Sequence, residues 1–317
     1  MLSAYSVIPL KRFGQNFLID DNITRKIRDA VFLNTGKTKA AKDYVLEIGP
    51  GSGALTNFLQ KKSKRLIAVE VDRVLCSALK RDFGKFKNTQ IVCSDILKFD
   101  LGAYLKRSKI NNLKVVANLP YYITTPIIEY LFKHLKSISD IFITVQKEVA
   151  ARMVAHHKTK DYGAFTCFVN YFCKPTILFK IKKDSFWPVP KIDSCFIRLL
   201  PHRDPKKLYN LSCEELFFKV VRAGFGQRRK QLLNPLSNIV PKDVLKKIIP
   251  GGILSSRAED LSLEDFVYLS NLLNDAKVME GSLSARSGTF WQKSAGLPAG
   301  RQACLSGRQG VRAKCPT

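Results

Sequence analysis

The sequence of 317 residues lacks long apolar runs, Cys-x-x-Cys pairs and a secretory signal. A membrane-spanning helix needs about 20 consecutive apolar residues, and the apolar runs here are short and interrupted by charge. The eight cysteines have none of the paired short spacings of a zinc site. We expect most of them to be small buried hydrophobic residues, without a disulfide framework. We therefore expect a cytoplasmic protein that binds no metal and no membrane.

Acidic residues are scarce: 26 Asp and Glu stand against 53 Lys and Arg, for a formal charge of +27. Residues 281–317 contain six of the basic residues and no acid, so the rest of the chain carries +21. Such a charge favours a polyanionic partner, most commonly nucleic acid. Arg222, Arg228, Arg229 and Lys230 are the candidates for phosphate contacts, although a charge run is more often a solvated helix face.

Strands and helices alternate over the first two thirds of the chain. Short apolar strands are expected at 44–48, 65–69, 90–92, 114–117, 140–145, 176–181 and 195–200. This alternation predicts an α/β fold, a Rossmann-like parallel sheet with helices on both faces. Over 212–274, apolar residues three and four positions apart predict several short helices instead. We expect an α/β domain over 1–203, a small all-helical domain over 204–280 and a disordered basic tail over 281–317.

A glycine-rich turn follows the strand at 44–48. Gly49-x-Gly51-x-x-Ala54 lets a ligand approach the backbone closely and face a helix N-terminus. Glu70 ends the next strand, where its carboxylate can accept hydrogen bonds from ribose hydroxyls. These features are compatible with both NAD and S-adenosylmethionine.

Two further acids favour S-adenosylmethionine over NAD. Glu47 precedes the glycines within the strand and gives the pattern Glu-x-Gly-x-Gly-x-Gly. Asp95 follows the third strand, where it can accept from an adenine amino group, although a turn or cap role has equal weight for this residue alone. Ligands bind at such strand ends in open α/β sheets.

Asn118-Leu119-Pro120-Tyr121 follows the fourth strand. The Asn118 side-chain carbonyl, with a backbone carbonyl beside the proline, can accept both hydrogens of an exocyclic amine. The nitrogen lone pair then leaves conjugation with the ring and can attack a methyl sulfonium. Tyr121 offers a flat face for a flipped base. A simple Asn-Pro turn would leave the pattern of acids unexplained.

Nine motifs together resemble the KsgA-type small-subunit (16S) ribosomal RNA adenine dimethyltransferases over roughly residues 9–275. They are KRFGQNFL, EIGPGSGALT, EVDR, SDIL, NLPYYITTP, QKEVAARM, YGAFTCFVNYF, SFWPVPKIDS and FGQRRKQLLNPL. The resemblance implies transfer of two methyl groups from S-adenosylmethionine to each of two adjacent adenosines in a 3′-terminal hairpin. The implied partner is ribosomal RNA in the 30S particle, and we expect the protein to act as a monomer.

The resemblance also implies roles for individual residues. The expected cofactor-binding residues are Asn16, Leu18, Gly49, Gly51, Glu70, Asp95 and Asn118. The expected catalytic residues are Asn118, Tyr121 and Phe186, with Tyr121 and Phe186 stacking on the target base. Tyr122 and Trp187 depart from the family pattern and could alter the base pocket.

Two alternative functions share this fold. One is a macrolide-resistance-type large-subunit ribosomal RNA adenine methyltransferase, and the other is a non-enzymatic ribosome-assembly or transcription factor. The FGQRRKQLLNPL segment favours the small subunit over the first alternative. The NLPY motif and the acids Glu47, Glu70 and Asp95 are all intact, which argues against the non-enzymatic alternative.

Overall fold

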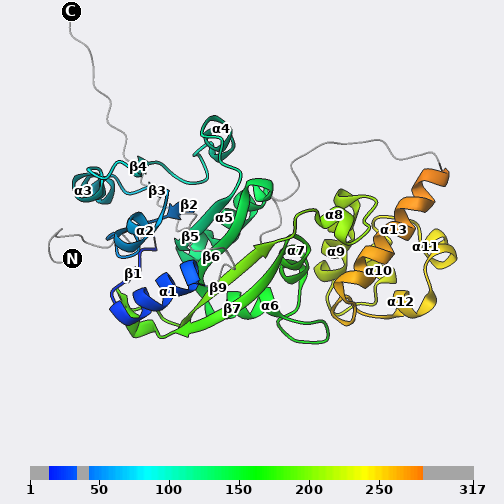
Figure 1. Ribbon diagram of the computed structural model, residues 1–317. Coiled ribbons are helices and arrows are strands. Elements are labelled where there is room, and N and C mark those ends of the chain that lie inside the picture. Colours follow the sequence, from blue (N-terminus) through cyan, green and yellow to red (C-terminus); the bar gives the residue numbers. More distant parts are fainter. Residues whose placement is uncertain (1–13, 34–42, 281–317) are drawn as a thin grey trace, which may run out of the picture. The chain divides into compact units, whose positions relative to one another are not determined.

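The computed structural model describes residues 14–33 and 43–280 (Figure 1). Within them, a seven-stranded sheet holds the candidate site. Its strand order is β4-β3-β2-β5-β6-β9-β7. The strands are β2 (Tyr44–Ile48), β3 (Arg65–Glu70), β4 (Thr89–Cys93), β5 (Leu113–Asn118), β6 (Ile138–Gln146), β7 (Cys173–Ile181) and β9 (Ser194–Pro201). All seven sequence-predicted strands are therefore present, with ends shifted by no more than three residues.

The sheet is parallel from β4 to β6 and antiparallel at its other edge. β2 pairs in parallel with both β3 and β5, whereas β9 runs antiparallel to β6 and β7. The chain builds outward from β2 to β4 and then returns to add β5 on the other side of β2. A reversal of this kind opens a crevice beyond the carboxyl ends of the two central strands. The Rossmann-like prediction is confirmed, with an antiparallel edge added.

The helices of this region follow the expected alternation. They are α1 (Asp21–Leu33), α2 (Thr56–Lys62), α3 (Arg73–Phe83), α4 (Leu101–Arg107), α5 (Thr124–Phe132), α6 (Lys147–Val154) and α7 (Ala164–Phe172). α1 begins where the sequence predicts, because the Asp20 carboxylate accepts the backbone N–H groups of Asn22 and Ile23 at 2.8 and 3.2 Å. The Asp72 carboxylate caps α3 in the same way.

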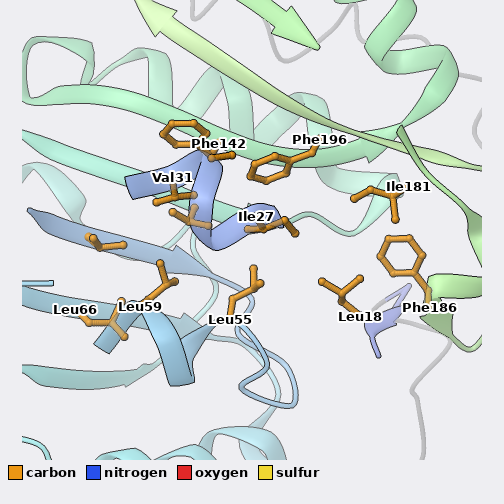
Figure 2. Close-up of a cluster of buried hydrophobic side chains, with 13 residues drawn as sticks. Leu18, Ile27, Val31, Leu55, Leu59, Leu66, Phe142, Ile181, Phe186 and Phe196 are labelled. Atoms are coloured by element: carbon orange, nitrogen blue, oxygen red, sulfur yellow. The ribbon is translucent and has the colours of Figure 1, made fainter. Parts of the chain in front are cut away.

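Helices α1 and α2 pack against the centre of the sheet. Ile27 and Val31 of α1 and Leu59 of α2 are fully buried, and they meet Phe142 of β6 and Phe196 of β9 in one cluster (Figure 2). Burying a side chain of this size stabilises the fold by about 1.5–3 kcal/mol. The central strands are thereby fixed, and with them the loops at their carboxyl ends.

Several helices follow the sheet, as the apolar spacing predicts, and one of them, α13, is longer than expected. They are α8 (Pro205–Leu208), α9 (Glu214–Gly226), α10 (Leu233–Leu236), α11 (Lys242–Ile248), α12 (Gly251–Ser255) and α13 (Leu263–Glu280). α9 packs on α13 and also on α7, which belongs to the sheet region. The sheet region and the helical region therefore form one compact unit among the described residues. The division at 203/204 stays a prediction, and the predicted tail lies outside the described residues.

The cysteines correct one expectation. Cys167, Cys173 and Cys195 are buried, as expected for small hydrophobic residues. Cys76 and Cys93, however, form a disulfide, because α3 packs against β4 and brings their Cα atoms to 5.8 Å. In the described part of the chain, no helix is long and apolar enough to cross a membrane.

Candidate functional site

A cleft lies at the carboxyl ends of β2, β3 and β5. Its lining comes from four segments: residues 14–18, the turn from Glu47 to Leu55, the segment from Glu70 to Leu75 and the segment from Asn118 to Ile123. Among the predicted site residues, those that line it are Asn16, Leu18, Gly49, Gly51, Glu70, Asn118 and Tyr121. The topology therefore gathers most of the predicted cofactor and catalytic residues at the crevice between β2 and β5.

The glycine turn after β2 leaves space for a ligand. Gly49 and Gly51 have φ angles of +65° and +59°, which side chains on L-residues rarely tolerate. Apart from Gly49 and its chain neighbours, no atom of the described residues lies within 4 Å of the point where a Cβ of Gly49 would stand, so the backbone there faces open space among them. A Cβ on Gly51 would instead meet the ring of Phe17 at 3.0 Å. The turn therefore exposes its backbone at Gly49 and is covered by an aromatic ring at Gly51.

The Glu70 carboxylate ties this turn to the end of β3. Its Oε2 accepts the Gly51 N–H at 3.0 Å, and its Oε1 accepts the Asp72 N–H at 2.9 Å. The side chain is only 3% exposed. Burial raises its pKa, and the two backbone donors oppose that shift. Each carboxylate oxygen keeps a second lone pair, so Glu70 can hold the turn and accept ligand hydroxyls together.

Glu47 is the second buried acid of the cleft. Its Oε2 accepts a hydrogen bond from the Thr56 hydroxyl at 2.7 Å. Its Oε1 is buried and has no hydrogen-bond partner among residues 14–33 and 43–280. Burial raises the pKa of Glu47 to about 8, and the nearby Glu70 adds to that rise. Because a buried polar atom is costly without a partner, this oxygen fits a hydrogen-bonding group of a ligand in the cleft.

Asn118 stands at the end of β5 with its amide orientation fixed. Its Nδ2 donates to the backbone carbonyl of Asn16 at 2.9 Å. Asn16 in turn donates from its own Nδ2 to the Gly14 carbonyl at 3.2 Å. This arrangement directs the Asn118 NH₂ group to residues 14–18 and leaves its Oδ1 as the acceptor for another group. The sequence does not predict that contact, because 102 residues separate the partners.

Tyr121 is held by a partner that the sequence gives no reason to select. Its hydroxyl hydrogen-bonds the Ser194 hydroxyl at 2.8 Å, and Ser194 is fully buried at the start of β9. Burial raises the pKa of Tyr121, so the phenol stays protonated at neutral pH. The ring is thus anchored at its hydroxyl end beside the cleft.

Phe186, which is predicted to stack on the target base, has a buried ring in this structure. Its side chain is 1% exposed and packs with Leu18 and Ile181 in the core cluster (Figure 2). The two-residue strand β8 (Phe186–Trp187) pairs antiparallel with β1 (Phe17–Leu18), which places Leu18 opposite Phe186 and Phe17 opposite Trp187. Because strand side chains alternate in direction, Phe186 enters the core while its neighbour faces outward. The Phe186 ring is packed in the core of this structure, and its stacking on the target base stays a prediction.

Asp95 is not one of the residues that line the cleft. Its Oδ1 accepts the Leu97 N–H at 2.9 Å, as a turn residue does. Burial and then the negative charge of Asp95 raise the pKa of Tyr122, which does line the cleft. Asp95 therefore lies close to the cleft rim, and its contact with adenine stays a prediction.

The four predicted RNA-binding residues differ in their surroundings. Arg228 donates from Nε to Glu259 at 2.8 Å and from a terminal nitrogen to the Lys160 carbonyl at 2.7 Å. Arg222 is partly buried and donates to the Phe218 carbonyl at 3.2 Å, and burial lowers its pKa to about 10. Arg229 and Lys230 are exposed. The exposed pair is therefore better placed to meet phosphates than Arg222 and Arg228.

No group of three or more potential metal ligands occurs within the part of the chain that the structure describes. The cleft chemistry rests on buried carboxyls, an oriented amide and a tyrosine ring. These groups suit a ligand with hydroxyl and other hydrogen-bonding groups, next to a planar amine.

Comparison with known proteins gives one consistent result. The family described as ribosomal RNA adenine dimethylase matches residues 10–275. Ribosomal RNA small subunit methyltransferase A of Clostridioides difficile (strain 630) is 42% identical over 270 residues, covering 83% of this chain and 90% of that protein. The protein of the same name from Lachnoclostridium phytofermentans is 40% identical over 284 residues, covering 87% and 95%.

Solved structures share the fold. The crystal structure of a dimethyladenosine transferase from Plasmodium falciparum has a TM-score of 0.66 at 25% identity, covering 82% of this chain and 98% of that one. The 23S rRNA methyltransferase ErmE has a TM-score of 0.61 at 22% identity, covering 82% and 100%. At that identity, the second similarity supports the fold alone.

Proposed function

The chain belongs to the ribosomal RNA adenine dimethylase family, and we propose that its cleft dimethylates the 6-amino groups of two adjacent adenosines in the 3′-terminal hairpin of small-subunit ribosomal RNA. The observation that supports this most directly is the fixed amide of Asn118, which donates to Asn16 and leaves Oδ1 to accept from an amine. That acceptor shares one cleft with the glycine turn and with Glu70.

S-adenosylmethionine is the cofactor that fits the residues of the cleft. Among the described residues the backbone at Gly49 faces open space, and the buried Oε1 of Glu47, which has no partner there, offers a hydrogen-bonding group to a polar group of the ligand. Glu70 supplies acceptors for ribose hydroxyls, and residues 14–18 cover the turn through Phe17. When bound, this cofactor supplies a methyl group on a sulfonium, which is an excellent leaving group.

The chain's own contribution to the reaction is positioning. Asn118 Oδ1 accepts one hydrogen of the target amine, and the backbone carbonyl of Leu119 is offered for the other. Both acceptors draw the nitrogen lone pair out of the ring and toward the methyl group. Tyr121, anchored by Ser194, gives the base a face on which to stack. Holding reactants in this geometry replaces covalent or metal-assisted steps.

The test of this function is methyl transfer to purified 30S subunits that lack the modification. We expect dimethylation of two adjacent adenosines, and little activity on a perfect duplex, because a base must leave its stack before it can react. Methylation of 50S subunits instead would favour the resistance-type alternative. Binding to 30S without transfer would favour the assembly factor.

Glu70→Ala is expected to weaken binding of S-adenosylmethionine by about 1–3 kcal/mol, or roughly five- to 150-fold, because charge-assisted hydrogen bonds are lost. Calorimetry measures this directly. Since Glu70 also holds the N–H groups of Gly51 and Asp72, the melting temperature without cofactor should fall as well. Glu70→Gln keeps one acceptor oxygen. Its cofactor affinity and melting temperature should therefore lie between those of the wild type and those of Glu70→Ala. Unchanged affinity in Glu70→Ala, or binding of NAD, would contradict the assignment.

Replacing both Arg229 and Lys230 with Ala is expected to weaken RNA binding about equally for all sequences. Loss of two phosphate contacts should reduce the slope of log K against log salt by about 1.4–1.8. Lys61 and Lys62 are the matched control pair, because both are exposed. They end α2, just before the chain enters β3 at the edge of the sheet opposite the cleft. Their replacement removes the same charge, so equal effects from both pairs would refute a local phosphate contact.

A further inference from the structure

We propose that Trp187 is a second aromatic platform for RNA, on which an unpaired nucleobase next to the target adenosine stacks. This inference rests on the proposed function, because it assigns a further contact to the same RNA substrate. Trp187 is 42% exposed, an unusual position for a large apolar side chain held in a short strand. Its position relative to the cleft and its rigid support both favour a ligand contact.

The backbone around Trp187 is fixed on both sides. β8 pairs with β1, and the Ile19 N–H donates to the Ser185 carbonyl at 2.9 Å just before it. The Ser185 hydroxyl also donates to the Asp20 carboxylate at 3.0 Å. Next to Trp187, the Phe186 side chain is locked in the core. The indole is therefore presented outward by a rigid segment and does not project from a loose loop.

Phe17 connects the indole to the glycine turn. The Phe17 and Trp187 ring centroids lie 6.5 Å apart, with only 22° between the ring planes. The Phe17 ring in turn lies so close to Gly51 that a Cβ there would be 3.0 Å from it. Trp187 is thus one aromatic ring away from the turn that lines the cleft. Trp187 is not one of the residues that line the cleft, so a base on the indole would lie beside the cleft.

Other exposed apolar side chains belong to the same end of the molecule. Tyr122 is 54% exposed and lines the cleft, and Ile19, which is 50% exposed, lies two residues from Phe17. Lys182, Lys183 and Lys191, which flank the Trp187 segment in the chain, are exposed too. A flat aromatic surface with nearby cations is the combination that single-stranded nucleic acid requires, with stacking for bases and positive charge for phosphates.

The sequence provides a direct reporter for this contact. Trp187 and Trp291 are the two tryptophans of the chain, and Trp291 lies outside the described residues. The substitution Trp291→Phe leaves Trp187 as the only tryptophan. Titration of this variant with an RNA hairpin that has unpaired adenosines in its loop should quench the indole emission, whereas a perfect duplex of equal length should not.

Binding measurements with further variants complete the test. On the Trp291→Phe background, Trp187→Ala should raise the Kd for the hairpin about tenfold to hundredfold, as for loss of one stacked base. Trp187→Phe should restore most of the affinity, and Val189→Ala, which removes a neighbouring exposed apolar side chain, should leave the Kd unchanged. Unquenched emission with an unchanged Kd in Trp187→Ala would overturn the proposal, as would equal losses in Trp187→Ala and Val189→Ala.

The same samples separate this inference from the proposed function. Wild-type protein is assayed in parallel for methyl transfer to unmodified 30S subunits. If it does not methylate, the function is wrong, and the hairpin titration still decides whether Trp187 contacts a base. If it methylates while Trp187→Ala binds hairpin as tightly as its parent, only the Trp187 proposal fails.

Discussion

Asn118→Ala should lower the single-turnover rate of methyl transfer by about 10²–10³-fold, the usual cost of losing one oriented hydrogen-bonding group that acts in the transition state. In the folded protein, the Asn118 NH₂ group is committed to the Asn16 carbonyl at 2.9 Å, so its Oδ1 is the acceptor for the amine. The amine–Oδ1 interaction strengthens as the nitrogen becomes tetrahedral, so its loss affects the rate more than substrate binding. RNA affinity should therefore change little.

The measurement is a single turnover on unmodified 30S subunits at saturating cofactor, with RNA affinity determined separately. Some loss of cofactor affinity is expected in Asn118→Ala, because its bond to Asn16 also orders residues that line the cleft. Tyr121→Ala is the comparison, since it removes a stacking face worth about 1–3 kcal/mol per base. It should reduce base capture as well as rate. A near wild-type rate for Asn118→Ala would make the mechanism wrong, even though the family is established.

Lys114→Ala should destabilise the fold by about 3–5 kcal/mol, as expected when one partner of a buried ion pair is removed. Lys114 lies inside β5 with its side chain 1% exposed. Its Nζ donates to the Val31 carbonyl at 2.7 Å and to the Asp43 carboxylate at 2.8 Å. It thereby joins the C-terminal end of α1 and the chain just before β2 to the strand that carries Asn118. The free energy of unfolding in urea measures the loss.

Two variants identify the cause of that loss. Lys114→Met keeps most of the apolar stem, so any remaining destabilisation reports the lost contacts of Nζ with the Val31 carbonyl and the Asp43 carboxylate. Adding Asp43→Asn to Lys114→Met should recover part of the stability, because it also removes the negative charge that pairs with Lys114 in the wild type. A loss below about 1 kcal/mol in Lys114→Ala would be typical of an exposed ion pair and would contradict this description of the buried contact.

Much of the fold and of the cofactor site could be predicted because the relevant signals are local. The strand at 44–48, the glycine turn after it and the helix at 73–83 are all encoded by contiguous residues. The Gly49-x-Gly51 turn needs backbone conformations that glycine alone adopts readily, so its sequence and its geometry correspond directly. Glu70 and Asn118 could be assigned because the carboxyl ends of parallel strands meet at one edge of the sheet.

The sequence alone determined the fold class, the cleft edge and seven of the residues that line the cleft. The tertiary structure decided which of two adjacent aromatic residues is buried, because the pairing of β8 with β1 turns Phe186 inward and Trp187 outward. It also decided that Lys114 is buried and that Arg228 pairs with Glu259. A charged residue looks the same in the sequence whether it faces water or a distant carboxylate. These outcomes depend on contacts between residues 31 to 170 positions apart, which no local pattern encodes.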